Sequence, residues 1–157
     1  IGETRYKGYV LRYAKTKGDT TQYMTPNSGV REVSTVNTYY FEKIHKLCEE
    51  NNIELIIVSV PSIRYWTYKK HNGVSKLAEE YGVQYWDFNV DKELNIDWSK
   101  DTPDKGSHLN LYGAQKLTSR IGELLSTKTD AEFTDRRGDA NFALWNEGWL
   151  EFKKKLR

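Results

Sequence analysis

The chain has 157 residues, which suits one compact domain around a single hydrophobic core. Its 24 Lys and Arg nearly balance its 22 Asp and Glu, and a formal net charge of +2 gives no sequence-wide attraction to nucleic acid. The single cysteine, Cys48, excludes an internal disulfide framework and a zinc cluster made of cysteines. No window approaches the ~20 apolar residues of a membrane-spanning helix.

The first part of the chain changes character at Ser34. Residues 1–34 hold no hydrophobic period and predict an irregular lead-in, in which residues 6–13, YKGYVLRY, could form a short strand or hairpin arm. Residues 34–52 predict a helix, with Ser34 or Thr35 as its N-cap and an Asn pair as its stop. Four of its side chains fall on one predicted buried face: Tyr40, Ile44, Leu47 and Cys48.

Two apolar runs in the middle of the chain predict parallel strands. Residues 53–60, IELIIVSV, are nearly continuous in branched side chains, as in a strand covered on both faces, and end at Pro61. Asn72 is expected to cap the next helix, and Gly82 to end it in a left-handed conformation. Residues 83–88, VQYWDF, then form the second strand.

A long polar connection, residues 89–109, precedes a helix that Asn110 should cap. This helix has an apolar stripe of Ala114, Leu117, Ile121, Leu124 and Leu125. The tail should form one more helix that packs on the body through Phe142, Trp145, Trp149, Phe152 and Leu156. We therefore divide the domain into a lead-in (1–34), an α/β part (35–127) and a C-terminal extension (128–157).

Alternating helices and strands predict right-handed βαβ units and a parallel sheet. Two parallel strands do not make a stable sheet, because such sheets need several neighbours and cover on both faces. The chain also begins with Ile1. We therefore expect that N-terminal strands of the same domain are missing from this sequence.

The polar connection holds an aspartate and a histidine in the stretch DKGSHLN, residues 104–110. A serine hydrolase needs an imidazole base close to its nucleophile, and a carboxylate on the other ring nitrogen to orient that base. Gly106 lets the loop turn sharply enough to bring Asp104 and His108 together. The pattern alone also fits a histidine in a simple capped turn.

Residues 101–122, DTPDKGSHLNLYGAQKLTSRIG, resemble the block that carries the aspartate and histidine of the SGNH/GDSL-type hydrolases. The strand end VPS (60–62), the strand end YWDFN (85–89) and the tail from DRRGD (135–139) to WNEGW (145–149) are similar to bacterial SGNH-like proteins, so the resemblance covers roughly residues 35–157. It implies a flavodoxin-like, three-layer parallel α/β fold. It also implies an exported or cell-surface location.

The resemblance implies an esterase or O-acyltransferase that acts on O-acyl esters, either small molecules or acetylated polysaccharides, without a metal or other cofactor. His108 and Asp104 would be catalytic, and we expect Ser62, Trp66 and Asn110 to contact the substrate. The spacing Asp-x-x-x-His is one residue longer than the usual Asp-x-x-His. The Gly-Asp-Ser nucleophile block of the family lies upstream of the matched region and does not occur here; Gly18-Asp19 is followed by Thr20.

Three other interpretations remain open. Asp101, Asp104 and His108 could bind a metal ion, although they match no specific ligand signature. The many aromatic side chains could make the chain a carbohydrate-binding remnant of the fold, with Trp66, Trp86 and Trp98 near the pocket and Trp145 and Trp149 in the core. An exposed sheet edge could also pair with another copy or another protein.

Overall fold

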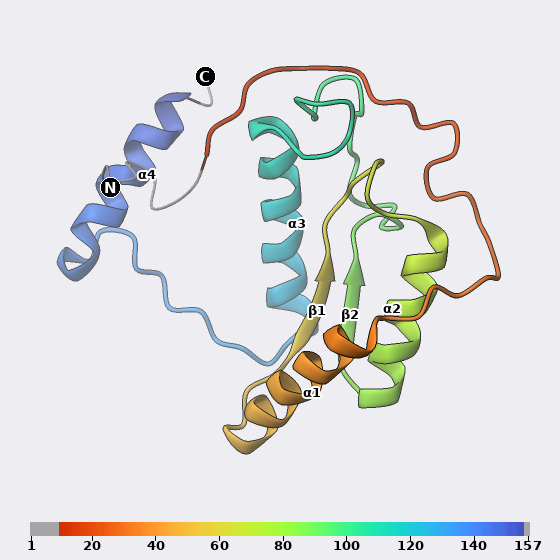
Figure 1. Cartoon of the computed structure of the whole chain (residues 1–157). Coiled ribbons are helices and arrows are strands. Elements are labelled where there is room, and N and C mark those ends of the chain that lie inside the picture. The colour runs from red at the N-terminus through yellow and green to blue at the C-terminus, as the bar shows by residue number, and fades with distance from the viewer. Residues whose placement is uncertain (1–9, 156–157) are drawn as a thin grey trace.

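The computed structural model describes residues 10–155, and these form one small parallel sheet with helices around it (Figure 1). The elements follow in the order α1 (Thr35–Glu50), β1 (Ile56–Ser59), α2 (Tyr68–Tyr81), β2 (Gln84–Asp87), α3 (Leu111–Lys128), the 3-10 turn η1 (Ala140–Phe142) and α4 (Ala143–Lys155). Residues 10–34 contain no helix or strand. Of the stretch 6–13, only residues 10–13 are described.

The two strands are parallel, and α2 makes the crossover between them. Their register pairs Ile56 with Gln84 and Ser59 with Asp87. α2 and α3 lie on opposite sides of the two strands, as Figure 1 shows. The elements of residues 10–155 therefore form three layers, and the loops at the carboxyl ends of both strands emerge together.

Side-chain and glycine caps set the helix boundaries, as the sequence predicts for most of them. The Ser34 hydroxyl accepts from the Asn37 N–H at the start of α1, and Gly82 ends α2 with φ 65°. The prediction for the start of α2 is wrong. Thr67, not Asn72, is its N-cap, and Asn72 lies within the helix, where its side-chain amide donates to the carbonyls of residues 27 and 29.

The hydrophobic core lies between β2 and α3. Phe88, Leu94 and Leu117 are buried, with Trp86, Ile96, Leu109, Ile121 and Leu124 packed around them. The predicted buried stripe of α3 is confirmed at Leu117, Ile121 and Leu124.

The lead-in is tied to the carboxyl end of the sheet. Figure 1 shows residues 10–33 crossing that end and then descending along the outer side of α2. Backbone hydrogen bonds fix its path: the Thr16 N–H donates to the Thr102 carbonyl, and the Arg31 N–H donates to the Lys69 carbonyl. Gly73 of α2 allows the close approach of the second contact, because a Cβ at this position would meet the Arg31 carbonyl oxygen at 2.0 Å.

Several side chains that the sequence places in the core are exposed. On α1, Tyr40, Ile44 and Leu47 are 60%, 51% and 58% exposed, so the prediction that this face is buried is wrong for the described residues. In the tail, Trp145 and Trp149 are 61% and 46% exposed, so the prediction that both lie in the core is also wrong. No helix within residues 10–155 is long and apolar enough to cross a membrane.

Candidate active site

A buried hydroxyl, that of Thr102, fixes the turn within the loop between β2 and α3. Thr102 is fully buried, and its Oγ1 accepts hydrogen bonds from the N–H groups of Gly106, at 2.7 Å, and of Asp104, at 3.4 Å. Gly106 has φ 94°, and a Cβ there would lie 2.5 Å from Ile63 Cδ1. The predicted sharp turn at Gly106 is confirmed, and it brings residue 108 back toward residue 104.

Asp104 and His108 form a close pair. His108 Nδ1 lies 2.5 Å from Asp104 Oδ2, and the His108 backbone N–H donates to Asp104 Oδ1 at 2.9 Å. A charged carboxylate can only accept, so Nδ1 carries the proton in this contact. The lone pair of the neutral imidazole is then on Nε2, which is the atom that a general base needs.

The pair has unequal access to solvent. The His108 side chain is 59% exposed and the Asp104 side chain 33%. Partial burial acts to raise the pKa of Asp104, but hydrogen bonds from the His108 ring and backbone outweigh it, so this pKa lies below its ordinary value. Within residues 10–155, no hydroxyl or thiol is hydrogen-bonded to His108 Nε2. The ring is oriented by Asp104, and its Nε2 has no hydroxyl or thiol partner among these residues.

Ser62 and Asn110 form buried hydrogen bonds with the backbone of the loop that carries His108. Ser62 is 7% exposed, and its hydroxyl donates to the Ser107 carbonyl at 3.1 Å. Asn110 is 1% exposed. Its side chain caps α3 at the N–H groups of residues 112 and 113, and donates to the carbonyls of residues 14 and 100. Both side chains therefore have structural contacts, and contact of Ser62 and Asn110 with a substrate stays a prediction.

Trp66 belongs to a second polar cluster, at the carboxyl end of β2. Its Nε1 donates to Asp87 Oδ2 at 2.9 Å, and His71 Nδ1 lies 2.8 Å from the same oxygen. Asn89 donates to Asp87 Oδ1 through its backbone and its side chain. The Asp87 side chain is 1% exposed. Trp66 therefore stabilises a buried carboxylate, and contact with a substrate stays a prediction.

The cluster extends to Tyr85, whose hydroxyl donates to Asp87 Oδ2 and lies 3.0 Å from Ser59 Oγ. Burial, together with the charge of Asp87, raises the pKa of Tyr85 well above its ordinary value. His71 and Asp87 also line a cavity of about 370 Å³ beside α2. The sequence interpretation missed this second His-Asp pair, because it began the helix at Asn72 and so left His71 outside α2.

The open interpretation of Asp101, Asp104 and His108 as metal ligands is not supported by the arrangement of the described residues. The Asp101 carboxylate is 3% exposed and forms a 2.7 Å ion pair with Lys116. No group of three or more His, Cys, Asp or Glu side chains within residues 10–155 is placed to hold a metal ion.

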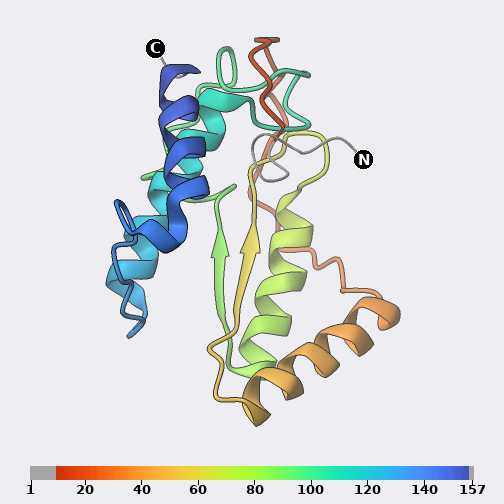
Figure 2. The ribbon, with the colours of Figure 1, turned by 90° about the vertical axis from the view of Figure 1, so that its left-hand side faces the viewer.

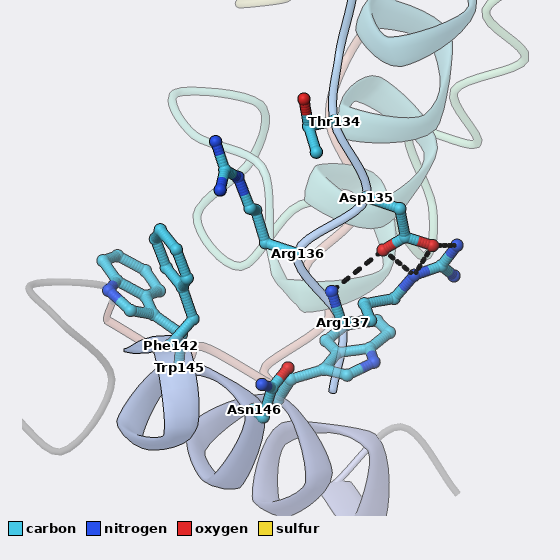
Figure 3. A pocket seen from close by; sticks show the side chains of 8 residues that line it. Thr134, Asp135, Arg136, Arg137, Phe142, Trp145 and Asn146 are labelled. Atoms are coloured by element: carbon cyan, nitrogen blue, oxygen red, sulfur yellow. Dashed lines mark hydrogen bonds and ion pairs between the residues drawn. The ribbon is translucent and has the colours of Figure 1, made fainter. Parts of the chain in front are cut away.

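An aromatic surface lies elsewhere, between the segment 134–137 and the helix α4. Here a cavity of about 520 Å³ is lined by Phe142, Trp145, Trp149 and two arginines. Figure 3 shows Phe142 and Trp145 side by side, with Arg136 reaching toward them from the preceding segment. Arg137 is paired with Asp135 at 2.6 Å. The Arg136 side chain is 57% exposed and only 3.8 Å from Asp139.

No model of a protein family, no curated protein and no solved structure matches this chain.

Proposed function

We propose that the chain supplies the base and its orienting acid to a Ser-His-Asp type site that cleaves or transfers O-acyl esters. The observation that carries the proposal is the 2.5 Å contact between His108 Nδ1 and Asp104 Oδ2, which leaves an exposed Nε2. The two hydrogen bonds that Asp104 accepts from His108 support it as well, because they fix the ring orientation.

The chemistry assigned to each group follows from this geometry. His108 Nε2 removes the proton from a hydroxyl nucleophile outside residues 10–155 as that oxygen attacks the ester carbonyl. The protonated ring then gives its proton to the departing alcohol, and Asp104 stabilises the imidazolium in between. Water, or a second alcohol such as a sugar hydroxyl, attacks the acyl intermediate, and the ring serves again as base.

The resemblance of residues 101–122 to the SGNH/GDSL-type hydrolases supports the same reaction and favours acylated carbohydrates as substrates. In an open parallel sheet, ligands bind outside the carboxyl ends of the strands. His108 lies in the loop that follows β2, which satisfies this rule. The proposed substrate class is an O-acyl ester, small or attached to a polysaccharide.

Hydrolysis of p-nitrophenyl acetate by the gene's full-length product, beside the 157-residue chain, tests the proposal. We expect the full-length product to hydrolyse the ester at a rate well above the buffer rate. The 157-residue chain should remain near that rate, since no hydroxyl within residues 10–155 is hydrogen-bonded to His108 Nε2. Equal activity of the two proteins, or no activity in the full-length product, contradicts the proposal.

The aromatic cavity favours a second function, carbohydrate binding. Flat aromatic faces stack on sugar rings, and a guanidinium such as that of Arg136 pairs with a carboxylate, so an acidic sugar fits this chemistry.

We expect polygalacturonate to quench the tryptophan fluorescence of the chain more strongly than neutral xylan does. Trp149→Ala should weaken this binding at least ~10-fold, a loss on the order of 1.4 kcal/mol. Trp98→Phe, on a tryptophan outside the cavity, is the control. Equal binding by both variants would argue against this site.

A further inference from the structure

α1 carries two apolar faces, and the described residues cover only one. Phe41 meets Tyr81 of α2 edge to face at 5.2 Å between ring centroids, and the Tyr81 hydroxyl donates to Glu42 at 2.8 Å. The second face consists of residues three or four positions apart, all between 51% and 62% exposed: Val36, Tyr40, Ile44 and Leu47. A helix that is apolar on two sides is typical of one that packs against two partners.

β1 is uncovered in the same region. The sheet order β1-β2 leaves the outer edge of β1 without a neighbour among residues 10–155. Val58 lies in register with Trp86 and therefore on the same face, yet Trp86 packs against the α3 core while Val58 is 41% exposed. Val60 is 56% exposed. α3 thus covers β2 and leaves β1 open on this face.

The handedness of the crossover connections determines on which side of β1 a further parallel strand would lie. Crossovers between parallel strands are right-handed in nearly all proteins. α1 contacts α2, so both helices belong to the same face of the sheet, and a strand that precedes α1 has to lie on the side of β1 away from β2. Figure 2 shows α1 on that side, beyond β1.

The path of the lead-in agrees with this position. The Leu111 N–H donates to the Arg12 carbonyl at the start of α3, so the described chain begins near the carboxyl end of the sheet (Figure 1). A strand parallel to β1 would end there as well. Parallel strands are covered by helices on both faces, which accounts for the exposed Val58 and Val60.

We propose that the outer edge of β1 and the second face of α1 bind a strand and helix of the natural polypeptide that precede the lead-in. The strand runs parallel to β1, and its helix covers Val58 and Val60 from the side of α3. Two copies of this chain joined at their β1 edges about a twofold axis would pair antiparallel, against the parallel order of the sheet. This inference does not depend on the chemistry proposed for His108.

Hydrogen exchange and thermal unfolding of the full-length product and the 157-residue chain test the inference. Amides of Ile56–Ser59 should exchange at least ~10-fold more slowly in the full-length product. In that product Leu47→Asp should lower Tm by at least ~5 °C, whereas Lys46→Asp, on the same helix but outside the apolar face, should change it little. In the 157-residue chain both variants should have a small effect.

Three results would overturn the inference. The first is equal exchange of Ile56–Ser59 in the two proteins. The second is equal tolerance of both substitutions in the full-length product. The third is a concentration-dependent dimer of the 157-residue chain that protects the same amides, since this assigns the surface to a second copy. Ester hydrolysis is not used in any of these measurements, so the two proposals can fail separately.

Discussion

Replacing His108 by alanine in the full-length product should lower kcat for p-nitrophenyl acetate by at least ~100-fold, with KM nearly unchanged. Loss of a general base removes a contribution that exists mainly in the transition state, and such losses commonly amount to 100-fold or more. The exposed position of His108, 59% of the side chain, makes a folding defect a small part of the effect. Initial rates over a range of ester concentrations measure both constants.

A substitution of Asp104, the partner of His108, tests the same reaction a second way. Asp104→Asn should lower kcat by at least ~10-fold, because an amide in place of the carboxylate no longer fixes the ring with its proton on Nδ1. Asp97→Asn, the same substitution on an exposed side chain of the same connection, serves as the control and should keep the rate. Unchanged rates in the His108 and Asp104 variants would remove the pair from the reaction.

Lowering the pH weakens the contact between His108 and Asp104 by protonating the Asp104 carboxylate. The pKa of this carboxyl is lowered in the folded chain, so its contribution to stability is fully present above the ordinary value of 3.8. That contribution is lost as the pH falls below 3.8 and through the lowered pKa. An assay near neutral pH therefore measures His108 beside a charged Asp104.

Replacing Asp87 by alanine should cause the largest loss of stability, about 3–5 kcal/mol. The carboxylate is 1% exposed and accepts hydrogen bonds from Trp66, His71, Tyr85 and Asn89, all of which would lose a buried acceptor. In urea unfolding of the full-length product we expect the midpoint to fall by more than ~1 M without a large change in slope.

The control for Asp87 is another aspartate with a close partner but with access to water. Asp135 is paired with Arg137, and its side chain is 57% exposed, so Asp135→Ala should cost less than ~1 kcal/mol. If the two variants unfold at the same urea concentration, the buried cluster does not contribute the stability assigned to it.

The sequence predicted the features that depend on local chemistry. Ser34, Gly82 and Asn110 each end or begin a helix through contacts within a few residues, and all three were identified. Gly106 and the proximity of Asp104 and His108 follow from the same kind of short-range geometry. Because Gly106 adopts a positive φ, the four-residue spacing of Asp104 and His108 was enough to predict that their side chains meet.

Features that depend on distant contacts were missed. The start of α2 at Thr67 carries no apolar period, so the polar Asn72 was taken for the cap. The link between His71 and Asp87 joins residues 16 positions apart, and nothing in their spacing indicates it. The apolar face of α1 was predicted to be buried, yet Tyr40, Ile44 and Leu47 are exposed in the described structure, because a hydrophobic period does not identify the segment that would cover it.

Labelling of the full-length product with a fluorophosphonate, followed by peptide mass spectrometry, tests whether His108 activates a hydroxyl nucleophile. We expect a modified serine or threonine outside residues 10–155. We also expect labelling to slow at least ~100-fold in the His108→Ala variant, because the base activates that hydroxyl. A label on a residue within 10–155, or equal labelling of the variant, would contradict the account of His108 and Asp104 as the base and acid of a site completed from elsewhere.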